Sequence, residues 1–172
     1  MTTSHVVVQH TALKIMKRKI YIETSVISYL TARPSNDSIK AACQKITQLW
    51  WDTGRLSATT FVSPFVVEEA SAGDVAAARA RIEVLRTLPI MEVTNEVLEL
   101  ADFLLLGGGL PEKAKLDALH IACAAYYEAD VLLTWNCTHI ANPTQLPIMR
   151  GLCDAKGYRL PELVTPFELM ED

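Results

Sequence analysis

The segment that follows Asp117 limits the possible folds more than any other part of the chain. From Ala118 to Tyr127 nearly every side chain is apolar, so a helix here has no polar face to turn toward water. A second, mostly apolar run, Val131 to Asn136, comes directly after it and has the length of a buried strand. A buried helix that leads into a buried strand is typical of layered proteins with a parallel sheet, so we expect an α/β fold.

The start of this helix can be placed from the residues before it. Three glycines, Gly107 to Gly109, end the preceding element, Pro111 suits a first helical position, and Glu112 favours the positive end of the helix dipole. We therefore expect the helix to begin at Pro111. Because an unpaired buried carboxylate is costly, Asp117 should meet a cation, a metal or a hydrogen-bond donor. The alternative is that Asp117 faces water and gains only from the dipole.

Two runs of strand-forming residues end in polar side chains. Glu23 closes a β-branched and aromatic run, and Thr24 or Ser25 can cap the helix that follows. Thr134 and Asn136 close the later apolar strand. Ligands of open parallel sheets bind outside the carboxyl ends of the strands, so these polar groups indicate one crevice.

The remaining elements follow from apolar spacing and from breaks at proline and glycine. Ser63 precedes a short apolar helical segment that ends in Glu68 and Glu69, one of which should face inward. The other expected helices lie at residues 38–51, 75–88, 95–106 and 148–156, and the other strands at 56–62, 90–93 and 163–164.

Four motifs follow one another along the chain: Ile20 to Val26, Ser63 with Glu69 six residues later, Leu116 to Ala122, and Leu133 to Asn136. In this order they resemble the motifs of the PIN domain, and more narrowly those of the VapC-like toxins of bacterial type II toxin-antitoxin pairs. The resemblance runs from about Lys19 to Phe167 and implies a PIN-like three-layer α/β/α fold with a mostly parallel central sheet. We accordingly expect a domain at residues 19–172, preceded by a flexible N-terminal extension at residues 1–18.

The family is one of endoribonucleases that depend on Mg2+ or Mn2+ and act as the toxin of the pair. The resemblance therefore implies an RNA substrate, a cognate antitoxin protein and a homodimer. It implies that Glu23, Glu69, Asp117 and Asn136 are catalytic, with Glu23, Asp117 and Asn136 as metal ligands and Glu69 orienting the attacking water or holding a second ion. The spacing from the serine selects Glu69 over Glu68.

Two positions depart from the common family pattern, which has Asp at position 23 and often at position 136. Glu23 carries its carboxylate one methylene farther out, and Asn136 offers an oxygen without a charge. Three negative charges remain, which is enough to hold a hard divalent cation. The alternative function is a catalytically weak or inactive PIN-fold module that binds a protein partner. A third is an unrelated metal phosphoesterase acting on small substrates.

Several polar neighbours can assist the acids. Thr24, Ser25, Thr134 and His139 are candidate substrate-binding residues. The three hydroxyls can hydrogen-bond the acids or a phosphate, or serve as helix caps and a strand terminus. For His139 we expect either a contact with phosphate or a hydrogen bond within the loop, and the sequence favours neither.

His120 lies three residues after Asp117, so on a helix the two side chains can touch. We expect this histidine to hold the carboxylate or to pack in the core. A zinc site drawn from His120, Cys123, Cys137 and His139 is a minor alternative, because it would leave the acids unexplained.

Charge argues against nonspecific binding of nucleic acid, since 20 acidic and 16 basic residues give a net charge of −4. Two basic groups can flank the cleft or can simply face solvent. They are Lys14, Lys17, Arg18 and Lys19, and Arg79, Arg81 and Arg86.

The sequence also indicates where the protein resides. The longest apolar runs are too short to span a membrane, no secretion signal is recognisable, and the four cysteines show no disulfide pattern, so we expect a cytoplasmic protein.

Overall fold

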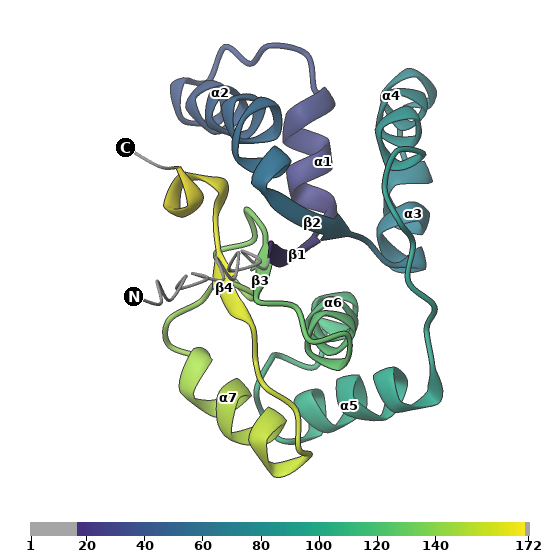
Figure 1. The fold of residues 1–172 in the computed structure, drawn as a ribbon, viewed down its shortest axis with the longest axis vertical. Coiled ribbons are helices and arrows are strands. Elements are labelled where there is room, and N and C mark those ends of the chain that lie inside the picture. Colours follow the sequence, from purple (N-terminus) through teal and green to yellow (C-terminus); the bar gives the residue numbers. More distant parts are fainter. Residues whose placement is uncertain (1–16, 171–172) are drawn as a thin grey trace, which may run out of the picture.

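Four parallel strands form one central sheet in the computed structural model, which describes residues 17–170 (Figure 1). The strand order is β2-β1-β3-β4, so the two central strands are β1 and β3. An α/β fold with a parallel central sheet is thereby confirmed. The strands are β1 (Arg18–Ile22), β2 (Ala58–Phe61), β3 (Val131–Leu133) and β4 (Glu162–Val164).

Helices lie on both sides of this sheet, which gives three layers consistent with a PIN-like α/β/α arrangement (Figure 1). The first four helices pack on one another, and α6 packs on α5, which also contacts α7. The helices are α1 (Thr24–Thr31), α2 (Ser38–Asp52), α3 (Pro64–Ser71), α4 (Val75–Leu85), α5 (Asn95–Leu106), α6 (Lys115–Tyr126) and α7 (Leu146–Ala155), with short 3-10 turns η1 (Gly54–Ser57) and η2 (Pro166–Leu169).

The core is centred on α6 and the two middle strands. Every residue from Ala118 to Ala125 is buried, as are all three residues of β3, which confirms the apolar segment as a core helix followed by a buried strand. The strand is shorter than predicted, since β3 ends at Leu133 and not at Asn136. Tyr21, Trp50 and Phe61 are among the largest fully buried side chains. Apolar burial on this scale is the main stabilising contribution to the fold.

The predicted start of the core helix is wrong. Residues Pro111 to Ala114 form a turn closed by the Ala114 N–H and the Pro111 carbonyl at 2.8 Å, and α6 begins only at Lys115. Glu112 therefore lies outside the helix, whereas Asp117 falls in its first turn, where a negative charge interacts favourably with the dipole.

Two further predictions about strands need correction. The expected strand at residues 90–93 is reduced to a single parallel bridge between Ile90 and Val62, because the chain turns into α5 after Thr94. The expected strand at 56–62 is shorter, since its first residues belong to the 3-10 turn η1.

The other boundaries agree more closely. Helix α5 matches its predicted range at both ends, α2 extends one residue beyond it, and α4 ends three residues early, at Leu85. The division between an extension at residues 1–18 and a domain at 19–172 stays a prediction, since residues 1–16 lie outside the described part of the chain. Within residues 17–170, no helix has both the length and the apolar character needed to cross a membrane.

Candidate metal and substrate site

Glu23 stands where β1 ends and α1 begins, and it caps that helix. Its side chain accepts hydrogen bonds from the backbone N–H of Ser25 at 3.1 Å, from the Ser25 hydroxyl, and from Thr134 Oγ1 at 2.6 Å. The residue is only 6% exposed. A charged group at this depth needs such partners, and all of them here are neutral.

Glu69 reaches the same region from α3. It accepts hydrogen bonds from the Thr24 hydroxyl and from His120 Nε2, the latter at 2.8 Å. Burial raises the pKa of Glu69, but the hydrogen bond and charge of His120 and the hydrogen bond from Thr24 outweigh it, so the pKa lies below its ordinary value. Glu68 is exposed, as expected if Glu69 is the inward-facing member of the pair.

Buried hydrogen bonds continue from Glu69 through His120 into the core. His120 is fully buried on α6, and its Nδ1 lies 2.7 Å from the Tyr21 hydroxyl, which also lies 2.7 Å from Ser63 Oγ. Ser63 begins α3 but makes no side-chain capping bond, because its hydroxyl turns to Tyr21 instead. An ionised Glu69 accepts the hydrogen bond from His120 Nε2–H.

The contact of His120 differs from the one predicted. We expected it to hold Asp117, three residues earlier on the helix, or to pack in the core. It is buried in the core, but its ring contacts Glu69, which is 51 residues away in the sequence. The sequence contained one signal for this network that we did not use. Tyr21 occupies a buried strand, and a buried tyrosine hydroxyl normally requires a partner.

Glu23, Glu69 and His120 lie close enough to share an ion. One ligand atom from each falls within 4.8 Å of the others. Two carboxylates and an imidazole suit a divalent cation, and the oxygen atoms are the ligands preferred by Mg2+ and Mn2+. The donor set therefore fits such a metal.

Asp117 belongs to a second group at the start of α6. Its Oδ1 accepts a hydrogen bond from Asn136 Nδ2 at 2.9 Å, and its Oδ2 lies 2.8 Å from His139 Nδ1. The Asn136 side-chain oxygen accepts the backbone N–H of His139 at 3.1 Å, so the amide turns its nitrogen, not its oxygen, toward Asp117. The backbone of His139 thus makes a hydrogen bond within the loop, its ring contacts Asp117 on α6, and a phosphate contact of His139 stays a prediction.

Thr134 joins the two groups. Its hydroxyl donates to Glu23 at 2.6 Å and accepts the backbone N–H of Asn136 at 2.8 Å. The predicted polar residues at the ends of β1 and β3 therefore do converge. They form two connected groups, with Glu23 and Glu69 in one and Asp117 and Asn136 in the other.

No lysine or arginine neutralises these acids within residues 17–170. Glu69 and Asp117 pair only with histidines, whose side chains are 1% and 25% exposed, and the ion pairs that involve arginine lie elsewhere, at Glu83 and Asp130. Carboxylates that lie close together without a permanently charged partner attract a cation.

Among the residues that the structure describes, the predicted basic groups do not pair with these acids, and Lys14 lies outside the described residues. Lys17 and Lys19 lie at the amino ends of the strands, opposite the acids. On α4, Arg81 donates to the carbonyls of Ala70 and Ala72 and so completes the end of α3.

The zinc alternative receives no support from the described residues. Cys123 is buried on α6 while Cys137 is exposed, and both histidines of the proposed set are engaged with carboxylates. The cluster of potential metal ligands found within residues 17–170 contains no cysteine.

Comparison with known proteins assigns no family. No family model matches the chain, and no curated protein matches it. One solved structure to which the chain is similar is VapBC2 from Rickettsia felis bound to a DNA fragment from their promoter. The two chains are 13% identical with a TM-score of 0.46, and the alignment covers 86% of this chain and 98% of that one.

Proposed function

We propose that this protein is an endoribonuclease dependent on Mg2+ or Mn2+ and the toxin of a toxin-antitoxin pair. The observation that carries the proposal is the pair of carboxylates Glu23 and Glu69, which lie close enough to share an ion, with Asp117 connected to Glu23 through Asn136 and Thr134. Within residues 17–170 no lysine or arginine is paired to these acids. The order of the four sequence motifs supports the same assignment. An RNA substrate, a cognate antitoxin and a homodimer are parts of this proposal.

In this scheme Glu23 and Asp117 hold the cation, and Asn136 contacts it through water. A bound divalent cation would acidify a water molecule and neutralise the charge that develops on the phosphodiester. Glu69 orients the attacking water or holds a second ion, and its lowered pKa keeps it ionised for either role near neutral pH.

The surrounding hydroxyls have a defined role in the proposal. Ser25, Thr134 and Thr24 hold the carboxylates of Glu23 and Glu69 in fixed orientations through neutral hydrogen bonds. Donors that fix an acid without cancelling its charge preserve its affinity for a cation. We therefore assign these residues to positioning of the acids and leave contact with the phosphate to His139.

The proposal is tested by RNA cleavage with and without Mn2+. We expect cleavage that requires the metal, stops in excess EDTA and is lost in Asp117→Asn. Glu68→Gln is the matched control, since it removes an exposed carboxylate beside Glu69 and should leave the rate unchanged. Cleavage that persists in EDTA, or in Asp117→Asn, would contradict the scheme.

A second candidate function is a protein-binding module that does not cleave RNA. It is favoured by Asn136, whose side-chain oxygen is occupied by the backbone of His139 and which adds no charge to the site. Calorimetric titration with Mn2+ separates the two functions. A folded protein that binds no metal at millimolar concentration supports the module, whereas stoichiometric binding lost in Asp117→Asn supports the nuclease.

A further inference from the structure

Two adjoining cavities lie between the end of α1 and the first half of α2, with volumes of about 380 and 290 Å³. Four residues line both of them, so the two cavities form one groove, which we call the α1–α2 groove. The shared residues are Tyr29, Ala32, Ser35 and Gln44. None of the residues that line the groove belongs to the proposed metal site.

The groove is positive although the chain carries a net charge of −4. Arg33, Lys40 and Lys45 line it, and no acidic residue does. All three are exposed, and within residues 17–170 none of them forms an ion pair. Asp37 lies beside the groove, where it caps α2 by accepting the backbone N–H of Lys40 at 2.9 Å. One negative charge against three positive charges leaves a surface that attracts an anion.

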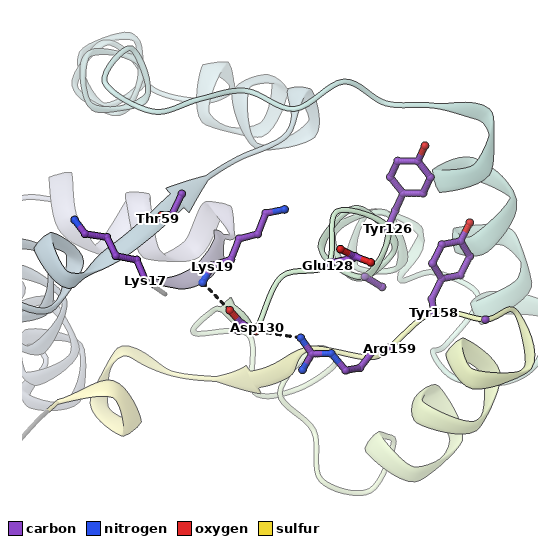
Figure 2. Close-up of a pocket in the computed structure, with 10 residues that line it drawn as sticks. Lys17, Lys19, Thr59, Tyr126, Glu128, Asp130, Tyr158 and Arg159 are labelled. Atoms are coloured by element: carbon purple, nitrogen blue, oxygen red, sulfur yellow. Dashed lines mark hydrogen bonds and ion pairs between the residues drawn. The ribbon is translucent and has the colours of Figure 1, made fainter. Parts of the chain in front are cut away.

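A larger cavity, of about 690 Å³, lies at the amino edge of the sheet and has no such excess of positive charge (Figure 2). Lys17 and Lys19 point in different directions there and donate to carbonyls on either side of β1. Glu128 and Asp130 also line that cavity. Its basic groups therefore do not converge on one anion, whereas those of the α1–α2 groove are not opposed by acidic lining residues.

The loop that carries Arg33 is held against α2 by Gln44. The Gln44 side chain donates to the Arg33 carbonyl at 2.8 Å and accepts the backbone N–H of Ser35 at 2.9 Å. Lys40 lies one helical turn before Gln44 on α2. The backbones of the two basic residues are thereby fixed relative to each other, which lowers the cost of ordering them when an anion binds.

The groove is connected to the acids along α1. The Ser25 hydroxyl donates to Glu23 and accepts the backbone N–H of Trp135 at 2.8 Å. The Trp135 ring lies beside that of Tyr29, which lines the groove, with the ring centroids 5.8 Å apart. Ser25 and Tyr29 are about one turn of helix apart, or about 6 Å. A nucleic acid strand with a phosphodiester at the acids therefore reaches the groove within a few nucleotides.

Tyr29 and Trp135 provide aromatic faces on this path. Both side chains are half-buried, and the Trp135 ring is fixed by its Nε1–H, which donates to Thr47 Oγ1 at 2.8 Å. The bases of a single strand stack on rings of this kind, whereas the bases of a duplex are already stacked on one another. The path therefore suits a single strand.

We propose that single-stranded RNA on one side of the scissile phosphodiester lies along α1, with bases against Tyr29 and Trp135 and phosphates at Arg33 and Lys40. The inference rests on the proposed function, because it names the form of RNA that the site cuts and the surface that holds it. Phosphate contacts from arginine and lysine position a strand without reading its sequence. The groove thus binds RNA locally despite the negative net charge of the chain.

The test is binding of a fluorescent single-stranded oligoribonucleotide of about 12 nucleotides to the full chain, measured by anisotropy in EDTA. EDTA prevents metal-dependent cleavage during the measurement. We expect the single strand to bind at least about 10-fold more tightly than the same strand annealed to its complement. Equal binding of the two forms overturns the inference, as does the absence of binding at about 100 µM protein.

The double variant Arg33→Ala/Lys40→Ala removes two phosphate contacts. For a single strand each contact contributes about 0.7 to the slope of log K against log salt, so the slope should become shallower by about 1.4 and the affinity should fall at least about 10-fold. The matched control is Arg150→Ala/Lys156→Ala, which removes two exposed positive charges at α7, away from the groove. An equal loss of affinity in the two double variants overturns the inference, because only net charge would then matter.

Two further measurements separate stacking from charge. Tyr29→Leu should weaken RNA binding at least about 5-fold and leave the salt slope unchanged, since it removes a stacking face but no charge. Unchanged affinity would contradict the placement of the bases. A polyglutamate peptide that displaces the RNA at an equal concentration of negative charge overturns the inference, because the groove would then suit an acidic protein partner.

Cleavage assays keep this inference distinct from the proposed function. If Mn2+-dependent cleavage is found but Arg33→Ala/Lys40→Ala binds RNA as the wild type does, the inference fails and the nuclease stands. If this variant loses RNA binding, the Arg150→Ala/Lys156→Ala control keeps it, and no cleavage is found with Mn2+, then the RNA-binding surface stands and the proposed activity fails.

Discussion

Replacing Tyr21 by phenylalanine isolates the energetic role of one buried hydroxyl. The ring of Tyr21 is fully buried, so phenylalanine fills the same space and leaves no cavity beyond one oxygen atom. The hydroxyl serves two partners at 2.7 Å, Ser63 Oγ and His120 Nδ1, and both of these residues are buried. A buried polar group left without its partner costs about 1–3 kcal/mol. With two such groups, we expect the free energy of unfolding to fall by about 2–4 kcal/mol.

Urea denaturation followed by far-ultraviolet circular dichroism measures this change. With an m value of about 2 kcal/mol/M, the midpoint should fall by about 1–2 M while m stays constant. Tyr158→Phe is the matched control, because within residues 17–170 its hydroxyl makes no hydrogen bond, and its effect should stay within about 0.5 kcal/mol. The reasoning is refuted if Tyr21→Phe is no more destabilising than this control.

A double mutant separates the two partners. Ser63→Ala removes the hydroxyl that Tyr21→Phe would leave without a partner, so the double variant should lose less stability than the sum of the two single variants, by roughly 1 kcal/mol. Strict additivity would show that the two hydroxyls do not interact in solution.

Three further outcomes are expected. The pKa of Glu69 in the folded protein lies below its ordinary value of 4.5, so the ionised carboxylate stabilises the wild type relative to Glu69→Gln above pH 4.5, and this stabilisation is lost as the pH falls through the folded pKa. Denaturation of both proteins at pH 6 and at pH 3.5 measures the difference in unfolding free energy. An equal difference at the two pH values would refute the prediction. Asn136→Asp replaces a hydrogen-bond donor to Asp117 by a like charge, so the variant should melt at a lower temperature than the wild type in the absence of metal. Added Mn2+ should raise the melting temperature of the variant more than that of the wild type. A melting temperature unchanged by the substitution would contradict the contact between Asn136 and Asp117. Iodoacetamide at pH 8 should label the exposed Cys137 in the native protein but not Cys123, because the Cys123 thiol is buried and burial raises its pKa to about 12. Peptide mass spectrometry measures the labelling. Equal labelling of the two cysteines would contradict the burial of Cys123.

The parts of the fold that sequence predicted are those set by local pattern. The apolar run from Ala118 and the strand at Val131 are recognisable because their composition leaves no other environment for them than the core. Glu23 and Thr134 could be placed at one edge because the carboxyl ends of parallel strands meet there, and they are in fact hydrogen-bonded.

What sequence missed depends on contacts between distant segments. His120 pairs with Glu69 rather than with its helical neighbour Asp117, because the position of α3 relative to α6 decides which carboxylate reaches the ring. The turn at Pro111 delays α6 although its residues favour a helix start. Tertiary packing here overrides the intrinsic helix propensity of these residues.

The order of the strands has a consequence for synthesis of the protein. β1 is among the first segments of the described chain to be made, yet it pairs with β3, and its Lys19 binds Asp130, which is 111 residues later. At a translation rate of roughly 5–20 residues per second, the nascent first strand waits on the order of 10 s for that partner. A ribosome-bound chain therefore has neither the central strand pair nor the complete set of acidic residues until most of its length has emerged.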